Sequence, residues 1–200
     1  EYRTYVDTYR YATQVATVST NHSPKEDTYI AQRMKHVHTH QNKLLNRSLP
    51  RPLRIGICAS GGGFRALLTT LGAVTGLADI GLLDTVSTFA GLSGSTWAVL
   101  PWIISLQPLS EYITPLTKRL SRGLLHTISE QYDDLARTTQ QKKICHLPIS
   151  AIDLYGIGLS HTLLKPLESD HTQIRFADLE QYSNPTLHPL PICTAATRAT

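Results

Sequence analysis

The chain has 200 residues, of which 41% are hydrophobic and 17% are charged, and its formal net charge is +4. This hydrophobic content excludes a disordered chain, and the length predicts one domain with a sizeable core. The small net charge and the absence of a matching motif exclude a nucleic-acid partner. Three cysteines predict no disulfide framework, which favours a reducing, cytoplasmic location.

The first quarter of the chain predicts a lead-in followed by one helix. Residues 1–25 are rich in Thr and Tyr without a clear period, and we expect them to be peripheral. Residues 26–46 read as a helix that Pro50 and Pro52 stop. Its cations are expected mainly on a solvated face. Its inward side chains are expected to be Ile30, Met34 and Val37, together with Leu44 and Leu45.

Two histidines of this helix suggest a metal site, because His36 and His40 lie on one face at a spacing of four residues. No carboxylate follows at the spacing of metalloproteases, however, and no cysteine pair lies nearby. The sequence therefore predicts a solvated basic helix here, and neither a metal nor a cofactor is expected.

The next segment predicts two strand-to-helix units in succession. An apolar run over residues 53–59 is followed by a glycine-rich loop and by a helix over about 64–79, with apolar side chains at helical spacing. A second strand-like run over residues 85–90 leads to Ser93, and a helix is expected from near Ser95. Pro101 falls in this helix, close to its first turns.

The remaining residues predict a cap and a further strand. Residues 110–145 read as two surface helices, residues 151–165 as an apolar lid or cap, and residues 189–194 as a short strand. Alternating strands and helices predict an α/β fold with a mainly parallel central sheet and helices on both faces.

Ser93 stands in Gly91-Leu-Ser-Gly-Ser95, a pattern typical of a nucleophile on a sharp turn between a strand and a helix. Gly91 and Gly94 suit such an elbow, because glycine permits close backbone approach and a tight turn. The fifth position of the pattern holds Ser95 instead of the usual glycine, which is still a small residue. Such a pentapeptide also arises by chance, and the alternative is a purely structural turn.

The loop Ser60-Gly-Gly-Gly-Phe-Arg65 follows the first strand and opens a helix. Its backbone N–H groups could hold a developing oxyanion. A plain turn or a phosphate site are the alternatives, but no Gly-Lys-Ser/Thr follows, which excludes a P-loop. The two motifs together, each at the end of a strand, indicate acyl transfer.

These two motifs resemble the cytosolic (group IV) phospholipase A2 family, which is related in fold to the patatin-like lipases. The resemblance covers about residues 30–195 and is tight only over about 54–100. It implies that residues 26–200 form the N-terminal part of a phospholipase A2 or lysophospholipase catalytic domain. The elbow and oxyanion loop would then lie within residues 53–105 and a cap segment within 110–170.

The resemblance also implies roles for single residues. Ser93 would be the nucleophile of a Ser-Asp dyad, and Gly62 and Gly63 would donate to the oxyanion. Arg65 would face the substrate phosphate or support the site; a salt bridge or a solvated position is the alternative. The implied partners are a phospholipid or lysophospholipid and, transiently, a membrane surface, and neither calcium nor another metal is implied.

One expected part of the dyad is missing. No aspartate of this sequence stands in the small-residue turn that the family uses, so we expect the partner Asp beyond residue 200, in the remainder of the catalytic domain. A serine without its base is a poor nucleophile. Three alternatives stay open: a histidine base, a lysophospholipase, transacylase or thioesterase with the same site, and a non-catalytic lipid-binding fragment or pseudoenzyme.

Overall fold

The structure is a computed structural model that describes residues 23–121, 132–144, 146, 148–164, 167, 174 and 179–194. Most of the expected lead-in over residues 1–25 and part of the cap over 110–170 lie outside them. The elements, in chain order, are α2 (Pro24–Leu45), β1 (Gly56–Ala59), α3 (Gly63–Asp79), η2 (Leu83–Thr85), β2 (Thr88–Leu92), α4 (Gly94–Ser105), α5 (Leu109–Leu120), α7 (Tyr132–Ile144), α8 (Ala151–Leu163), α9 (Leu179–Tyr182) and β3 (Leu190–Thr194).

The described strands form one parallel sheet in the order β1-β2-β3. The register places Phe89 of β2 between Ile57 of β1 and Pro191 of β3. Parallel neighbours need long crossover connections, and here α3 lies between β1 and β2 in the chain. The predicted α/β class with a parallel sheet is confirmed.

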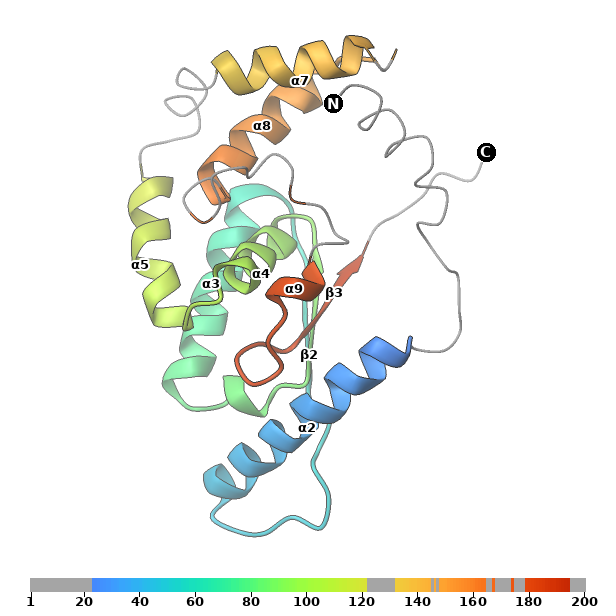
Figure 1. Cartoon of the computed structure of the whole chain (residues 1–200). Coiled ribbons are helices and arrows are strands. Elements are labelled where there is room, and N and C mark those ends of the chain that lie inside the picture. The colour runs from blue at the N-terminus through green and yellow to red at the C-terminus, as the bar shows by residue number, and fades with distance from the viewer. Residues whose placement is uncertain are drawn as a thin grey trace.

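Helices α3 and α4 pack side by side against one face of this sheet, and α5 covers them from outside (Figure 1). Phe89 of β2 points into this layer and is 1% exposed. Leu67 and Leu71, two of the apolar side chains at helical spacing in α3, are buried there with Trp102 of α4. The apolar spacing of α3 thus marked its core face correctly.

The opposite face of the sheet is open among the described residues. Leu92 and Ile192, one from each of two neighbouring strands, are each 45% exposed. Cys58 of β1 points to the same face and is also exposed. The apolar run over residues 53–59 is therefore partly buried on one face only, because no described helix packs on the Cys58 side of β1.

Helix α2 crosses the amino ends of the strands, at the end of the molecule away from α7 and α8 (Figure 1). It begins with a capping box between Ser23 and Glu26. Its fully buried side chains are Arg33, Val37 and Gln41, spaced by one helical turn.

Two expectations about α2 are wrong. Leu44 and Leu45 are exposed, whereas Arg33, expected among solvated cations, is 1% exposed. The burial of Arg33 and the exposure of the two leucines follow from the polar surface that α2 packs against. The chain just before each strand presents backbone groups that lack partners in the sheet, so this interface needs donors and acceptors more than apolar side chains.

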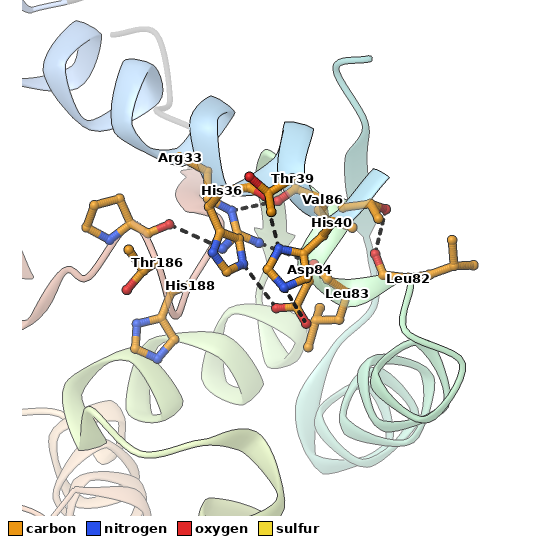
Figure 2. A network of polar contacts seen from close by, with 12 residues as sticks. Arg33, His36, Thr39, His40, Leu82, Leu83, Asp84, Val86, Thr186 and His188 are labelled. Atoms are coloured by element: carbon orange, nitrogen blue, oxygen red, sulfur yellow. Dashed lines mark hydrogen bonds and ion pairs between the residues drawn. The ribbon is translucent and has the colours of Figure 1, made fainter. Parts of the chain in front are cut away.

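Arg33 satisfies several of these backbone groups at once (Figure 2). Its guanidinium donates to the carbonyls of Val86 at 2.8 Å, Leu83 at 3.2 Å and Pro185 at 3.2 Å. On the same face of α2, Gln41 donates to the carbonyl of Leu53 and accepts from its N–H, ahead of β1. Helix α2 is thereby bonded to the approach of all three strands.

The cap region contains α7 and α8, which contact each other. Lys142 of α7 pairs with Asp153, which also caps the start of α8 at Ser150. Arg119 of α5 donates to the carbonyl of Thr162 of α8 at 3.3 Å, which joins the cap to the helical layer. No described helix is both long and apolar enough to cross a bilayer.

Replacing Arg33 by Met should destabilise the fold by at least about 3 kcal/mol, because three buried carbonyls lose a charged donor. Urea unfolding followed by circular dichroism measures the change. Lys35→Met, at an exposed position of the same helix, is the matched control and should change the stability by less than about 0.5 kcal/mol. Equal unfolding midpoints for the two variants would contradict the role of Arg33.

The buried ring of His188 predicts a loss of stability in acid. Burial beside Trp102, aided by the charge of Arg33, lowers the pKa of His188 from 6.5 to about 4. Between these two values the unfolded chain binds the proton and the folded chain does not. This group should therefore cost up to about 3 kcal/mol as the pH falls from 6.5 to 4.

The measurement is urea unfolding at several pH values for the native protein and His188→Leu. The variant should lack that part of the pH dependence, whereas His38→Gln, a control on α2, should retain it. An unchanged slope in His188→Leu would refute the assignment to His188.

Candidate active site

Ser93 lies at the turn between β2 and α4, where the sequence placed it. Its backbone has φ 54° and ψ −124°, a left-handed conformation that costs a non-glycine residue energy. The residue is exposed, and its carbonyl accepts from the N–H of Thr96 at 2.9 Å as α4 begins. This strained turn holds the hydroxyl out of the sheet, as a nucleophile elbow does.

The two elbow glycines are required by close packing. A Cβ on Gly91 would lie 3.0 Å from the backbone nitrogen of Thr96. A Cβ on Gly94 would lie only 2.0 Å from the carbonyl oxygen of Gly63, in the glycine-rich loop. A side chain at position 94 would therefore push the two loops apart. The predicted neighbourhood of the two motifs is present in the structure.

The glycine-rich loop lies at the amino end of α3, beside Ser93. Gly61 has φ 132° and Gly63 has φ 66°, which are conformations that L side chains rarely adopt. Gly62 precedes the helix as its cap and has no side chain to bond the free N–H groups. A Cβ built on Gly62 would lie 3.9 Å from the Ser93 Oγ, so the loop backbone is close to the hydroxyl.

A buried hydrogen bond joins the two helices behind these loops. Thr70 Oγ1 of α3 donates to Ser95 Oγ of α4 at 3.0 Å, and both residues are buried. The sequence showed Ser95 only as a departure from the elbow pattern. In the structure the Ser95 hydroxyl bonds α4 to α3, next to the turn that carries Ser93.

Two hollows flank the elbow, although Ser93 is not among the residues that line either. An apolar cavity of about 260 Å³ lies between α4 and α8 and includes Trp97, Leu100 and Leu163. Trp97 is also in edge-type ring contact with Phe64 of α3 and lies against Tyr155 of α8. No local sequence pattern indicates this cavity, because its walls come from segments about sixty residues apart.

The second hollow, of about 520 Å³, follows β1 and α3 and is lined by the glycine-rich loop and Arg65. Arg65 is exposed in the first turn of α3 and makes no ion pair with another described residue. Among the described residues, no carboxylate occupies its guanidinium. Arg65 therefore has no salt-bridge partner among the described residues.

No described side chain hydrogen-bonds the Ser93 hydroxyl. Asp153 is occupied by Lys142 and Ser150, and the first of these contacts lowers its pKa most. His188 is buried just before β3, at the amino edge, whereas Ser93 follows β2 at the carboxyl edge. His146 and His161 are described and do not bond this hydroxyl, whereas four further candidates lie outside the described residues: His126, His171, Asp170 and Asp178.

Comparison with known proteins supports the reading of these motifs. Residues 55–200 match the model of the lysophospholipase catalytic domain family. Phospholipase B of Cryptococcus neoformans var. grubii is 30% identical over 168 residues, which are 74% of this chain and 26% of that protein. Human cytosolic phospholipase A2 zeta is 27% identical over 149 residues, which are 70% of this chain and 17% of that protein.

Solved structures agree on the fold. A structure of human GIVD cytosolic phospholipase A2 superposes with a TM-score of 0.74 at 24% identity, covering 88% of this chain and 24% of that one. The same protein in complex with methyl γ-linolenyl fluorophosphonate and terbium chloride gives a TM-score of 0.70. The chain spans about a quarter or less of the length of these relatives.

The family match covers most of the chain, and the resemblance that the elbow and the glycine-rich loop indicated is thereby confirmed. The chain belongs to the lysophospholipase catalytic domain family, together with phospholipases B and the cytosolic phospholipases A2.

Proposed function

We propose that this chain carries the nucleophile and the oxyanion donors of a serine hydrolase that cleaves fatty-acyl esters of glycerophospholipids or lysophospholipids. The observation that carries the proposal is the strained, exposed Ser93 beside a glycine loop at a helix amino end. The names of the relatives, phospholipase B, cytosolic phospholipase A2 and lysophospholipase, support this substrate class.

The reaction follows from the positions of these groups. Ser93 Oγ loses its proton to a base and attacks the ester carbonyl, whose oxygen becomes an oxyanion. The N–H groups of Gly62 and Gly63, at the positive end of α3, stabilise this charge. The lysophospholipid alcohol leaves with the proton and an acyl-serine remains. Water then attacks the acyl-serine, releases the fatty acid and restores Ser93.

The base in this proposal is an aspartate beyond residue 200. Two observations support this: the Ser93 hydroxyl has no described partner, and Asp153 is engaged elsewhere. The chain also spans only about a quarter of its curated relatives, so residues 26–200 would be one part of a larger catalytic domain. On its own this part should turn over esters weakly or not at all.

Two features would recognise the substrate. The apolar cavity between α4 and α8 begins at Thr96 and Trp97, within about one helical turn of Ser93, and suits an acyl chain. Residues 110–170 would form the cap over it. Arg65 offers a fixed set of N–H donors to the lipid phosphate. We place the protein in the cytoplasm, with transient contact to membrane surfaces, as the cytosolic phospholipase A2 relatives suggest.

Ser93→Ala should abolish acyl release from phosphatidylcholine and lysophosphatidylcholine by the full-length protein, because it removes the hydroxyl that forms the acyl intermediate in this proposal. The native protein should gain one covalent adduct in intact-mass measurement after treatment with a fluorophosphonate lipid analogue, as its serine displaces fluoride. Ser110→Ala, at an exposed position of α5, is the control and should keep both properties.

The outcomes separate the alternatives. Liposome binding without acyl release or adduct would favour a non-catalytic lipid-binding protein. An adduct on the 200-residue chain alone would mean that its base lies within these residues, contrary to the proposal. Release from lysophosphatidylcholine alone would narrow the activity to a lysophospholipase.

Arg65→Ala should lower kcat/KM on a phospholipid by about tenfold or more, because it removes a charge-assisted contact to phosphate. On a fatty-acyl ester without phosphate the same variant should lose less than about threefold. Arg54→Ala removes an equally exposed cation at the amino edge and should affect neither substrate. Equal losses on both substrates would make Arg65 a structural residue instead.

A further inference from the structure

The sequence placed His36 and His40 on one helix face but offered no carboxylate near them. The structure supplies one from a segment that lies far along the chain. Asp84 of η2 lies against both histidines, and one ligand atom from each of the three side chains lies within 4.8 Å of the other two (Figure 2). All three residues are half-buried.

We propose that His36, His40 and Asp84 bind a divalent cation of the zinc class at the amino edge of the sheet. Two imidazoles and a carboxylate are a ligand set that zinc accepts. In a tetrahedral site with bonds of about 2.0–2.1 Å, ligand atoms lie about 3.3 Å apart. The His36 Nε2 lies 3.3 Å from Asp84 Oδ1, and the His40 Nε2 lies 4.0 Å from Asp84 Oδ2.

The hydrogen bonding of His40 prepares it as a ligand. Its Nδ1 is 3.0 Å from the carbonyl oxygen of His36, which only an N–H can bond. In the neutral ring the proton is then on Nδ1, so the Nε2 presents a lone pair toward the Asp84 carboxylate. Either a proton on Nε2 or a metal cation between Nε2 and the carboxylate removes the repulsion between this lone pair and Asp84. Metal-binding histidines commonly show this arrangement, with the second nitrogen donating to a carbonyl.

The surroundings also suit a metal. The opposing charge nearby is Arg33, but its guanidinium donates to the carbonyls of Leu83, Val86 and Pro185 and does not pair with Asp84. The Asp84 side chain is 48% exposed, which leaves room for water as a fourth ligand.

Such a metal would be structural rather than catalytic. It would tie α2 to η2, the segment that leads into β2, beside the contacts of Arg33. Ser93 follows the opposite end of β2, so the cation would not touch the reacting ester.

The test uses full-length protein that has been treated with a chelator and exchanged into metal-free buffer. Isothermal titration with Zn²⁺ should give one equivalent, and Co²⁺ should give the visible absorption of a tetrahedral site. Added Zn²⁺ should raise the Tm by several degrees. His40→Gln and Asp84→Asn should each weaken Zn²⁺ binding at least tenfold and remove the Tm shift.

His38→Gln is the matched control, because His38 lies on the same helix but bonds the carbonyl of Leu49 and is not part of the cluster. It should bind Zn²⁺ as the native protein does. Circular dichroism of the metal-free variants establishes that each is folded. Absence of a Zn²⁺ equivalent, or binding that is unchanged in both His40→Gln and Asp84→Asn, would overturn the proposal.

Discussion

The arrangement of the strands depends on a cation that is buried under their amino ends. Arg33 is almost fully inaccessible, and its guanidinium donates to three carbonyls from segments that precede β2 and β3. Burying a guanidinium is costly unless its donors are satisfied, and here backbone oxygens satisfy them. Because one side chain reaches segments that are distant in sequence, the position of α2 and the spacing of the strands are coupled.

Because the strands are parallel, the supporting contacts and the candidate active site lie at opposite edges of the sheet. All amino ends lie at one edge, where α2 and the buried His188 belong to the supporting structure. All carboxyl ends lie at the other edge, where the chain turns into α3 and α4 and exposes backbone N–H groups and Ser93. Open α/β sheets place ligands at this carboxyl edge for the same reason. The hydrogen bonds of α2 fix the strands at the amino edge, and the strained turn at Ser93 is built on the carboxyl end of β2.

The sequence predicted best what local spacing determines. Ser93, its glycines and the apolar stripe of α3 follow from neighbours within a few residues. The sequence could not predict contacts between residues that are far apart: Arg33 bonds carbonyls 50 to 152 residues away, and Asp84 lies 48 residues beyond His36. Leu44 and Leu45 were misassigned because apolar spacing predicts a core face only where the packing partner is apolar.

The backbone of Ser93 sets stability against activity at a single position. A non-glycine residue at φ 54° and ψ −124° carries a strain of about 1–3 kcal/mol, which glycine would relieve. Under the proposed function the hydroxyl is the reason for this strain, so selection for acyl transfer would keep a residue that is less stable here than glycine. A lineage that no longer needs the reaction would gain by exchanging Ser93 for glycine. Serine or glycine at position 93 of a related protein should therefore indicate whether that protein has kept the proposed acyl-transfer reaction.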